Sequence, residues 1–433
     1  MARGPFFFGW FSQSKLLRNV ATVAIGTAAA QVIGFAFSPI ITRIYGPEVF
    51  GLQGIFLSLI GVFSPIIALR YPMAIVTAEG LRESRSLVRL SILIASANSV
   101  VVLVILLIGG QTLLTLLGAA DLGALILLLP LALYCVALQD VMDFQATRFG
   151  AFRLVGLSAV FHALTTNLAR VIGGVGAATA FTFVLITALA PVVRAGFLFL
   201  GSRGVQRYST PFRKQRALAL LRKHRDFAIF RMPTDVLNAL SQSVPVLLLA
   251  ALFSPTAAGL YVLARTVLNL PANLIGTAVG NVLYARFAEL SRVNDPLPPL
   301  LLRSTASLLA FAPLLLGLSW FAPTVFSIVF GDDWREAGRY AQWMALWVSL
   351  MIANVPSVRI IPIIGRQRFL LFFNLALLLA RVIVVVSAWW WFDSAIFAVA
   401  WYSIVSSLII LIGIVWTFIL THNHVNEKSG YRK

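Results

Sequence analysis

Arginine residues stand inside and at the ends of long apolar stretches of this sequence. Arginine at the centre of a bilayer costs about 2.5–3.5 kcal/mol on insertion scales, so such residues usually face a bundle interior or a watery cavity. A guanidinium group pairs bidentately with phosphate or carboxylate. The pattern therefore predicts binding of an anion, with phosphate as the natural candidate. The arginines concerned are Arg43 and Arg70 at the ends of apolar stretches, and Arg170, Arg265 and Arg381 within them.

Few acidic residues are available to neutralise these arginines. Asp140, Asp143 and Asp235 lie near one predicted membrane boundary, and Asp393 lies near the other. A further arginine, Arg194, is expected to extend its side chain to the membrane surface, as long basic side chains near helix ends commonly do.

Amide side chains form two pairs at helical spacing. Asn238 and Gln242 are four residues apart, as are Asn269 and Asn273, so each pair shares one face of its helix. A polar stripe in a membrane helix either holds helices together or lines an aqueous path. Both interpretations stay open, because sugar hydroxyls and neighbouring helices both need such groups.

Enzymatic chemistry has little support in the sequence. It contains no Gly-Lys-Ser/Thr and no His-Glu-x-x-His, which disfavours an ATP-binding loop or a zinc protease site, and neither a cofactor nor a metal is expected. Asp332 and Asp333 are adjacent acids in a predicted outer loop. They leave a membrane glycosyltransferase or polymerase as an alternative, although a solvated loop explains them more simply.

The elements that position these residues are predicted to be membrane helices. The chain has 433 residues, of which 60% are hydrophobic and 11% charged, and this excludes an ordinary soluble domain. A span needs roughly 20 apolar residues. Windows of this length predict an all-α membrane protein with twelve spans, near residues 17–41, 50–69, 90–108, 122–141, 154–172, 178–200, 229–252, 258–283, 304–330, 340–361, 369–391 and 396–420.

The basic residues predict the orientation of these spans. With the N-terminus in the cytoplasm, 27 of the 34 Lys and Arg residues fall on the inner side and 3 on the outer side. This asymmetry is the positive-inside rule, and it favours an even number of spans with both termini in the cytoplasm. Topology thus accounts for the net charge of +19, and no nucleic-acid partner is expected.

Residues 201–228 form the longest predicted segment outside the membrane. They divide the chain into a first six-helix lobe, residues 1–200, and a second, residues 229–433, which includes a short tail. The stretch 213–224 mixes basic residues with Leu218, Leu220 and Leu221. It is expected to be either a helix on the anionic inner leaflet with its leucines in the lipid, or a solvated basic loop.

The two halves repeat each other. Pro47 and Gly51 stand at the start of the second span as Pro255 and Gly259 stand at the start of the eighth, 208 positions later. The segment 168–172, Leu-Ala-Arg-Val-Ile, recurs at 379–383. Each half has an even number of spans, so the repeats are expected to share one orientation about an axis along the membrane normal, which is a transporter architecture.

Several segments, including those that begin the second and eighth spans, resemble a known family. Thr42 to Gly51 (TRIYGPEVFG), Arg70 to Ile75 (RYPMAI), Asn238 to Ala250 and Gly259 to Tyr261 resemble bacterial oligosaccharide flippases. These are the polysaccharide and O-antigen transporters of the multidrug/oligosaccharidyl-lipid/polysaccharide exporter superfamily. In that family an Arg-aromatic-Glu sequence commonly follows the second span. Here Pro72 replaces the acid, which puts ion coupling through that glutamate in doubt.

The resemblance implies two six-helix lobes around a central cleft and a polyprenyl-diphosphate-linked oligosaccharide as cargo. The expected function is a flippase of the bacterial cytoplasmic membrane for surface polysaccharide such as lipopolysaccharide O-antigen, with the polysaccharide polymerase machinery as an optional partner. Arginines would hold the diphosphate and amides would contact sugars. A drug or cation exporter of the same superfamily is a further alternative, but it would require buried carboxylates.

Overall fold

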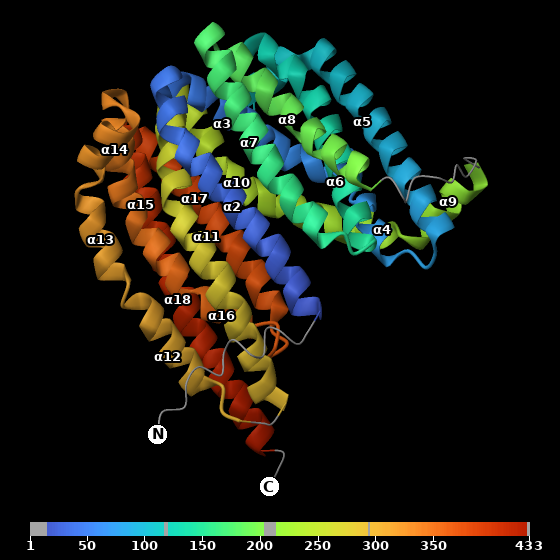
Figure 1. Cartoon of the computed structure of the whole chain (residues 1–433). Coiled ribbons are helices and arrows are strands. Elements are labelled where there is room, and N and C mark those ends of the chain that lie inside the picture. Colours follow the sequence, from blue (N-terminus) through green and yellow to red (C-terminus); the bar gives the residue numbers. More distant parts are fainter. Residues whose placement is uncertain (1–14, 117–119, 203–213, 293–294, 431–433) are drawn as a thin grey trace, which may run out of the picture. The chain divides into compact units, whose positions relative to one another are not determined.

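The computed structural model describes residues 15–116, 120–202, 214–292 and 295–430, and these contain helices without a strand (Figure 1). Within these described ranges, twelve helical segments are long and apolar enough to cross a membrane. They span Ala21–Ile44, Pro47–Ile67, Leu81–Gly110, Ala120–Arg148, Phe152–Gly176, Ala180–Gly201, Phe227–Leu252, Pro255–Arg292, Pro298–Trp320, Asp332–Ile360, Phe372–Phe392 and Ala395–Asn423. The predicted all-α class and the twelve spans are confirmed.

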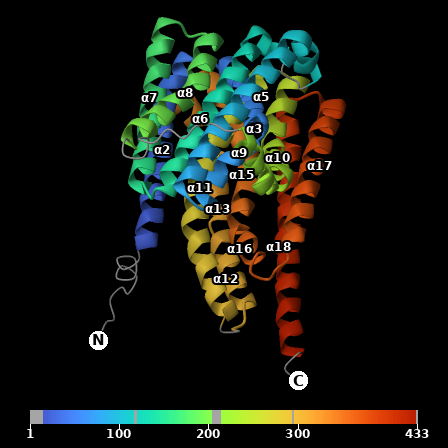
Figure 2. The same ribbon diagram turned by 90° about the vertical axis from the view of Figure 1, so that its right-hand side faces the viewer.

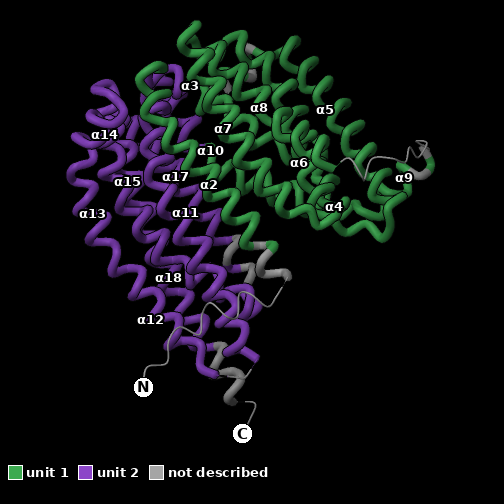
Figure 3. Tube along the Cα trace, viewed as in Figure 1, with its two compact units in different colours: residues 1–45, 52–243 green, residues 46–51, 244–433 purple. Residues whose placement is uncertain are grey.

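The chain forms two compact units (Figure 3). Unit 1 comprises residues 1–45 and 52–243, and unit 2 comprises residues 46–51 and 244–433. The division between residues 243 and 244 falls within one helix, α10 (Met232–Leu252), rather than in the basic segment 201–228. The six-helix lobes with a linker at 201–228 stay a prediction, and residues 203–213 of that linker lie outside the described ranges.

Unit 1 is a set of long helices packed side by side. α2 (Lys15–Ile44) packs on α7 (Phe152–Gly176), α6 (Leu129–Arg148) packs on α8 (Ala180–Gly201), and α5 (Leu81–Leu116) packs on α6. The α2–α7 contact brings backbones together, because a Cβ atom on Gly26 would stand 2.5 Å from the Cα atom of Gly156. Small residues permit this approach, as is usual between membrane helices.

Unit 2 is organised around α15 (Arg335–Ala353). This helix packs against α11 (Pro255–Arg292), α14 (Ala322–Phe330) and α18 (Ala395–Gly430). α17 (Gln367–Phe392) runs beside α18 (Figure 2). Shorter helices α12 (Pro298–Leu309), α13 (Ala312–Trp320) and α16 (Val355–Ile360), with the 3₁₀ turn η3 (Asp332–Trp334), complete it.

Proline and glycine residues set several helix boundaries. Pro130, Pro313 and Pro356, which the sequence places inside spans, each stand in the first turn of a helix, where a missing N–H costs nothing. Gly109 breaks the regular backbone of α5, and Gly123 adopts φ 49° inside the 3₁₀ segment η1 (Ala120–Leu128). The spans are therefore less regular than an apolar window predicts.

Two short helices form outside the predicted spans, and for the second the sequence left a helix and a solvated loop as alternatives. α4 (Tyr71–Thr77) follows α3 (Pro47–Ile67), and α9 (Lys214–Lys223) precedes the π-helical turn η2 (Phe227–Arg231). Lys223 contacts Glu79 and Glu83 at 2.9 Å, and these hydrogen bonds raise the pKa of Lys223. The Lys223 contacts fasten α9 to the start of α5.

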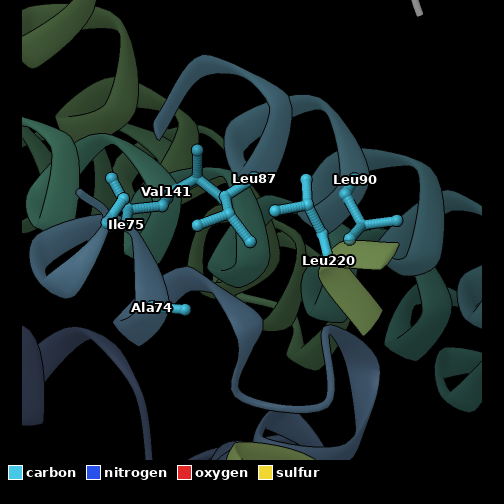
Figure 4. Packing of buried hydrophobic residues seen from close by; sticks show 7 residues of the cluster. Ala74, Ile75, Leu87, Leu90, Val141 and Leu220 are labelled. Atoms are coloured by element: carbon cyan, nitrogen blue, oxygen red, sulfur yellow. The ribbon is translucent and has the colours of Figure 1, made fainter. Parts of the chain in front are cut away.

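Leu220 differs from the expectation that the leucines of the basic segment lie in lipid. It is 6% exposed and belongs to a cluster of buried apolar side chains with Ala74, Ile75, Leu87, Leu90 and Val141 (Figure 4). Leu221 packs against the same cluster, while Leu218 is 49% exposed. The expectation is wrong for Leu220, because α4, α5 and α6 already offer its side chain an apolar surface.

Candidate functional site

Arg70 stands in the turn between α3 and α4, in an unusual backbone conformation. Leu69 and Arg70 have φ angles of 49° and 58°, and side chains disfavour this left-handed region by roughly 1–2 kcal/mol per residue. Its Nε lies 2.7 Å from Oδ2 of Asp235, and its Nη1 lies 3.5 Å from Oδ2 of Asp140. The predicted anion ligand Arg70 is thus paired with two carboxylates of the protein itself.

The neighbouring acids and arginines of unit 1 are paired as well. Asp235 also contacts Nε of Arg231 at 3.2 Å, one helical turn away. Arg194 Nη2 lies 2.9 Å from Oδ1 of Asp143. Arg194 therefore contacts a carboxylate on α6, and its extension to the membrane surface stays a prediction. Three aspartates and three arginines thus form a formally neutral group on α6, α8, η2, α10 and the α3–α4 turn.

Arg170 on α7 packs against α8. Its Nη2 donates to Oγ1 of Thr187 at 3.3 Å, and its guanidinium carbon lies 4.9 Å from the ring centroid of Phe183. Tyr45 stacks on Phe183 with a centroid distance of 4.4 Å, and its hydroxyl donates to the carbonyl oxygen of Arg170 at 3.0 Å. Burial raises the pKa of Tyr45. A cation over an aromatic face is stabilised electrostatically, so these contacts hold Arg170 within unit 1.

Arg381 on α17 makes the corresponding contacts in unit 2. Its guanidinium carbon lies 5.2 Å from the ring centroid of Tyr402 and 5.9 Å from that of Trp347. Its Nε donates to Oγ of Ser406 at 3.5 Å. The ring of Tyr402 meets that of Tyr261, on α11, edge to face. Arg381 is thus held in an aromatic cluster within unit 2, and Arg265 lies on α11, the helix that carries Tyr261.

The surroundings of Arg170 and Arg381 are equivalent. In each unit the next helix supplies an aromatic residue and, four positions later, a hydroxyl residue: Phe183 and Thr187 on α8, Tyr402 and Ser406 on α18. The internal repeat therefore includes the contacts of these arginines as well as their positions. The sequence analysis missed these four residues, although their four-residue spacing is readable in both halves.

The predicted amides lie on more open surfaces of their helices. Asn238 and Gln242 on α10 are exposed, as is Asn273 on α11, while Asn269 is partly buried. Arg43, at the end of α2, is exposed too. These polar groups are therefore more accessible than Arg70, Arg170 and Arg381, which make contacts within their own units.

Asp332 takes part in a local turn. Its carboxylate accepts a hydrogen bond from the Ser327 hydroxyl, and the nearby Trp334 is 1% exposed and meets Phe50 edge to face. Within the described ranges, no three His, Cys, Asp or Glu residues are grouped so that they could hold a metal ion.

Solved membrane transporters share this fold. The chain superposes with a TM-score of 0.69 on the inward-facing conformation of a multidrug resistance MATE family transporter of the MOP superfamily, at 14% identity, covering 91% of this chain and 95% of that one. With the lipid II flippase MurJ in an inward closed conformation the TM-score is 0.67, at 12% identity, covering 93% of this chain and 90% of that one. These likenesses establish the fold.

Curated relatives belong to polysaccharide biosynthesis. The succinoglycan biosynthesis transport protein ExoT of Rhizobium meliloti (strain 1021) is 25% identical over 324 residues, which cover 74% of this chain and 63% of ExoT. The teichuronic acid biosynthesis protein TuaB of Bacillus subtilis (strain 168) is 26% identical over 156 residues, covering 36% of this chain and 29% of TuaB. The chain thus matches less than two thirds of the length of these relatives.

A family model, described as polysaccharide biosynthesis protein, matches residues 40–339. This range contains the segments 42–51, 70–75 and 238–250 that carry the resemblance, and the resemblance is confirmed. The chain therefore belongs to the polysaccharide biosynthesis protein family.

Proposed function

We propose that this protein is a flippase for a polyprenyl-diphosphate-linked oligosaccharide. It would move this lipid from the inner to the outer leaflet of the bacterial cytoplasmic membrane by alternating access, for assembly of a surface polysaccharide. The observation that carries the proposal is the combination of membership in a polysaccharide biosynthesis family with arginines inside membrane-spanning helices. A diphosphate needs cations at membrane depth, and guanidinium groups bind phosphate with two hydrogen bonds.

The binding residues are proposed to line a central cleft between two lobes, residues 1–200 and 229–433. Exposed groups would contact the cargo first: Arg43 the diphosphate, and the amides of Asn238, Gln242 and Asn273 the sugars. Asn269 and Arg265 would join them from α11. Arg170 and Arg381 would add positive potential, and Arg70 would reach the cargo when its contacts with Asp140 and Asp235 change. The prenyl chain would remain in lipid.

Orientation and partners follow from the charge distribution. Both termini are proposed to be cytoplasmic, with the basic segment 201–228 on the side of the anionic inner leaflet, where its exposed basic residues would bind lipid head groups. The polysaccharide polymerase machinery is a natural downstream partner.

Because arginine stays protonated, it binds charge without carrying protons. Either an ion gradient or removal of the product outside would then drive transport.

The alternatives receive less support. A drug or cation exporter would need carboxylates free to bind cations, but Asp140, Asp143 and Asp235 are paired with arginines. A glycosyltransferase or polymerase would use Asp332, whose carboxylate is engaged by Ser327. We therefore propose a transporter without enzymatic activity.

Mass spectrometry of lipid extracts from a deletion strain tests the proposal. A flippase defect leaves complete oligosaccharide repeats on polyprenyl diphosphate and removes the surface glycan, and the wild-type gene restores export. Truncated glycolipids would instead indicate a transferase. An unchanged lipid profile together with an intact surface glycan would contradict the flippase.

A further inference from the structure

Arg70 is held in place at the expense of an unfavourable backbone. The two left-handed residues Leu69 and Arg70 are consecutive in the turn that follows α3, and neither is glycine. Among the described residues, Asp393 is the one other non-glycine residue with a positive φ. Such conformations persist where surrounding contacts over-determine them, and they concentrate at binding sites and switches. The contacts of the Arg70 side chain are therefore candidates for a conformational switch.

Those contacts are of unequal quality. The pair with Asp235 is close, at 2.7 Å, whereas the pair with Asp140 is longer, at 3.5 Å. The Arg70 side chain is 23% exposed, whereas its Nε, which faces Asp235, is buried. Asp235 has a second cation, Arg231, at 3.2 Å. If Arg70 left Asp235, the carboxylate of Asp235 would remain paired with Arg231.

The helix that carries Asp235 belongs to both units. α10 runs without interruption from Met232 to Leu252, and the division between the units falls after Ser243. The ion pair with Arg70 fastens the first turn of α10 to the α3–α4 turn of unit 1. A change at this ion pair would therefore alter how firmly the start of α10 is held.

We propose that the Arg70–Asp235 ion pair is a latch that the anionic head group of the cargo opens by exchange. A phosphate group takes the place of the Asp235 carboxylate on the Arg70 guanidinium, and Asp235 passes to Arg231. The α3–α4 turn then releases the start of α10. This inference rests on the proposed function, because it takes the cargo to be a prenyl diphosphate.

The exchange replaces one anionic partner of Arg70 by another. Carboxylate and phosphate bind guanidinium with the same geometry, and a diphosphate carries more charge than one carboxylate. A ligand shifts a conformational equilibrium only by its differential affinity for the two states. Phosphate supplies this difference, since it gains both hydrogen bonds of Arg70 only after Asp235 has left. Cargo recognition and movement of α10 thereby become one event.

Spin labels at Val76 and Phe230 report on the latch. Both side chains are exposed, and they lie on α4 and η2, two elements that contact each other. Cys135 would first be replaced by alanine in the full-length protein. Pulsed electron paramagnetic resonance then measures the distance distribution with and without farnesyl diphosphate, a short prenyl diphosphate. We expect the ligand to increase the ratio of the longer-distance to the shorter-distance population about fivefold. This is the lower end of the fold-changes that typical allosteric coupling produces.

Substitutions separate the latch from general destabilisation. D235N should show the longer distance without ligand, and D235E should restore the parent distribution. D143N removes an acid from the Arg194 pair, away from α10, and serves as the matched control that keeps the parent distribution. Unfolding temperatures of all variants would show that each is folded.

Two results would overturn the latch. The first is a D235N distribution identical to that of the parent. The second is an unchanged distance distribution of the parent protein in saturating farnesyl diphosphate, where calorimetry has shown that the ligand is bound. The D235N comparison needs no cargo, so its result stands apart from the lipid analysis of the deletion strain that tests the flippase.

Discussion

Gly51, in the first turns of α3, packs so closely on Pro255 of α11 that a Cβ atom at Gly51 would stand 1.7 Å from the Pro255 carbonyl oxygen. The reverse contact has the same form: a Cβ atom at Gly259 would stand 1.9 Å from the carbonyl oxygen of Pro47. All four residues belong to unit 2. The two Pro-x-x-x-Gly sequences of the internal repeat therefore pack on each other reciprocally, as paired surfaces related by a two-fold axis do.

The variants G51A and G259A should each destabilise the protein. A methyl group cannot fit beside a backbone carbonyl at these distances, so the helix starts would have to separate, at a cost of about 1–3 kcal/mol or more. G46A is the control in the same segment, because a Cβ atom there meets nothing within 4 Å. Thermal unfolding in detergent measures the effect. Unfolding temperatures for G51A equal to those for G46A would refute the reciprocal contact.

The fold was predictable to the extent that the membrane dictates it. A span must present about 20 apolar residues, so composition alone locates twelve helices. The short helix α9 was harder to interpret, because its basic residues are equally typical of a solvated loop. What places Leu220 inside the protein is the apolar surface of Ala74, Leu87 and Val141, which come from three other segments. Such a surface exists only after the chain has folded.

The arginines should separate into two classes on substitution by alanine. R170A and R381A should lower the unfolding temperature, because each loses a cation–aromatic contact worth about 0.5–2 kcal/mol and a hydrogen bond to a hydroxyl. R43A, at an exposed site, should change stability less than R170A and R381A do, and it should reduce export. Both readouts are needed: unfolding temperature in detergent and surface glycan per amount of protein.

The lysine variants R170K and R381K refine this comparison. They retain the charge but lose the planar guanidinium group, so intermediate unfolding temperatures are expected. Full stability of R170A together with complete loss of export would instead make Arg170 a direct ligand of the cargo.

The candidate site was predictable in its arginines but not in their partners. Arg170 and Arg381 lie at a fixed offset within matching five-residue segments, 168–172 and 379–383, and a repeat search finds them. Phe183 and Tyr402 occupy equivalent positions at a different offset, because the chain between arginine and aromatic residue differs in length between the halves. Asp235 is remote from Arg70 in sequence, and only folding brings the two side chains together.

Docking of α9 should depend on Leu220 and not on Leu218. L220A removes a side chain that is 6% exposed, and such substitutions cost about 2–5 kcal/mol when a cavity remains. L218A removes a side chain that is 49% exposed and should have little effect. Hydrogen exchange of residues 214–223 measures the docking directly. Equal exchange in the two variants would mean that the apolar cluster does not hold α9.

The exposed amides allow a test of whether α10 and α11 line an aqueous path. An unpaired amide is costly in hydrocarbon, so the exposure of Asn238 and Asn273 is best explained by contact with water. In a protein whose single cysteine, Cys135, has been replaced by alanine, N238C and N273C should react quickly with a charged, water-soluble maleimide. The reagent needs the thiolate form, which requires water.

Two apolar positions supply the controls, one in each unit. Val100 on α5 is 59% exposed and Ile412 on α18 is 62% exposed, and both lie well inside membrane-spanning segments. Cysteines there should face lipid and react about tenfold more slowly or less. If N238C and N273C were as unreactive as V100C and I412C, the amides would have to hold helices together instead. The cargo path would then need other polar groups, and the proposed contacts of Asn238 and Asn273 with sugars would be contradicted.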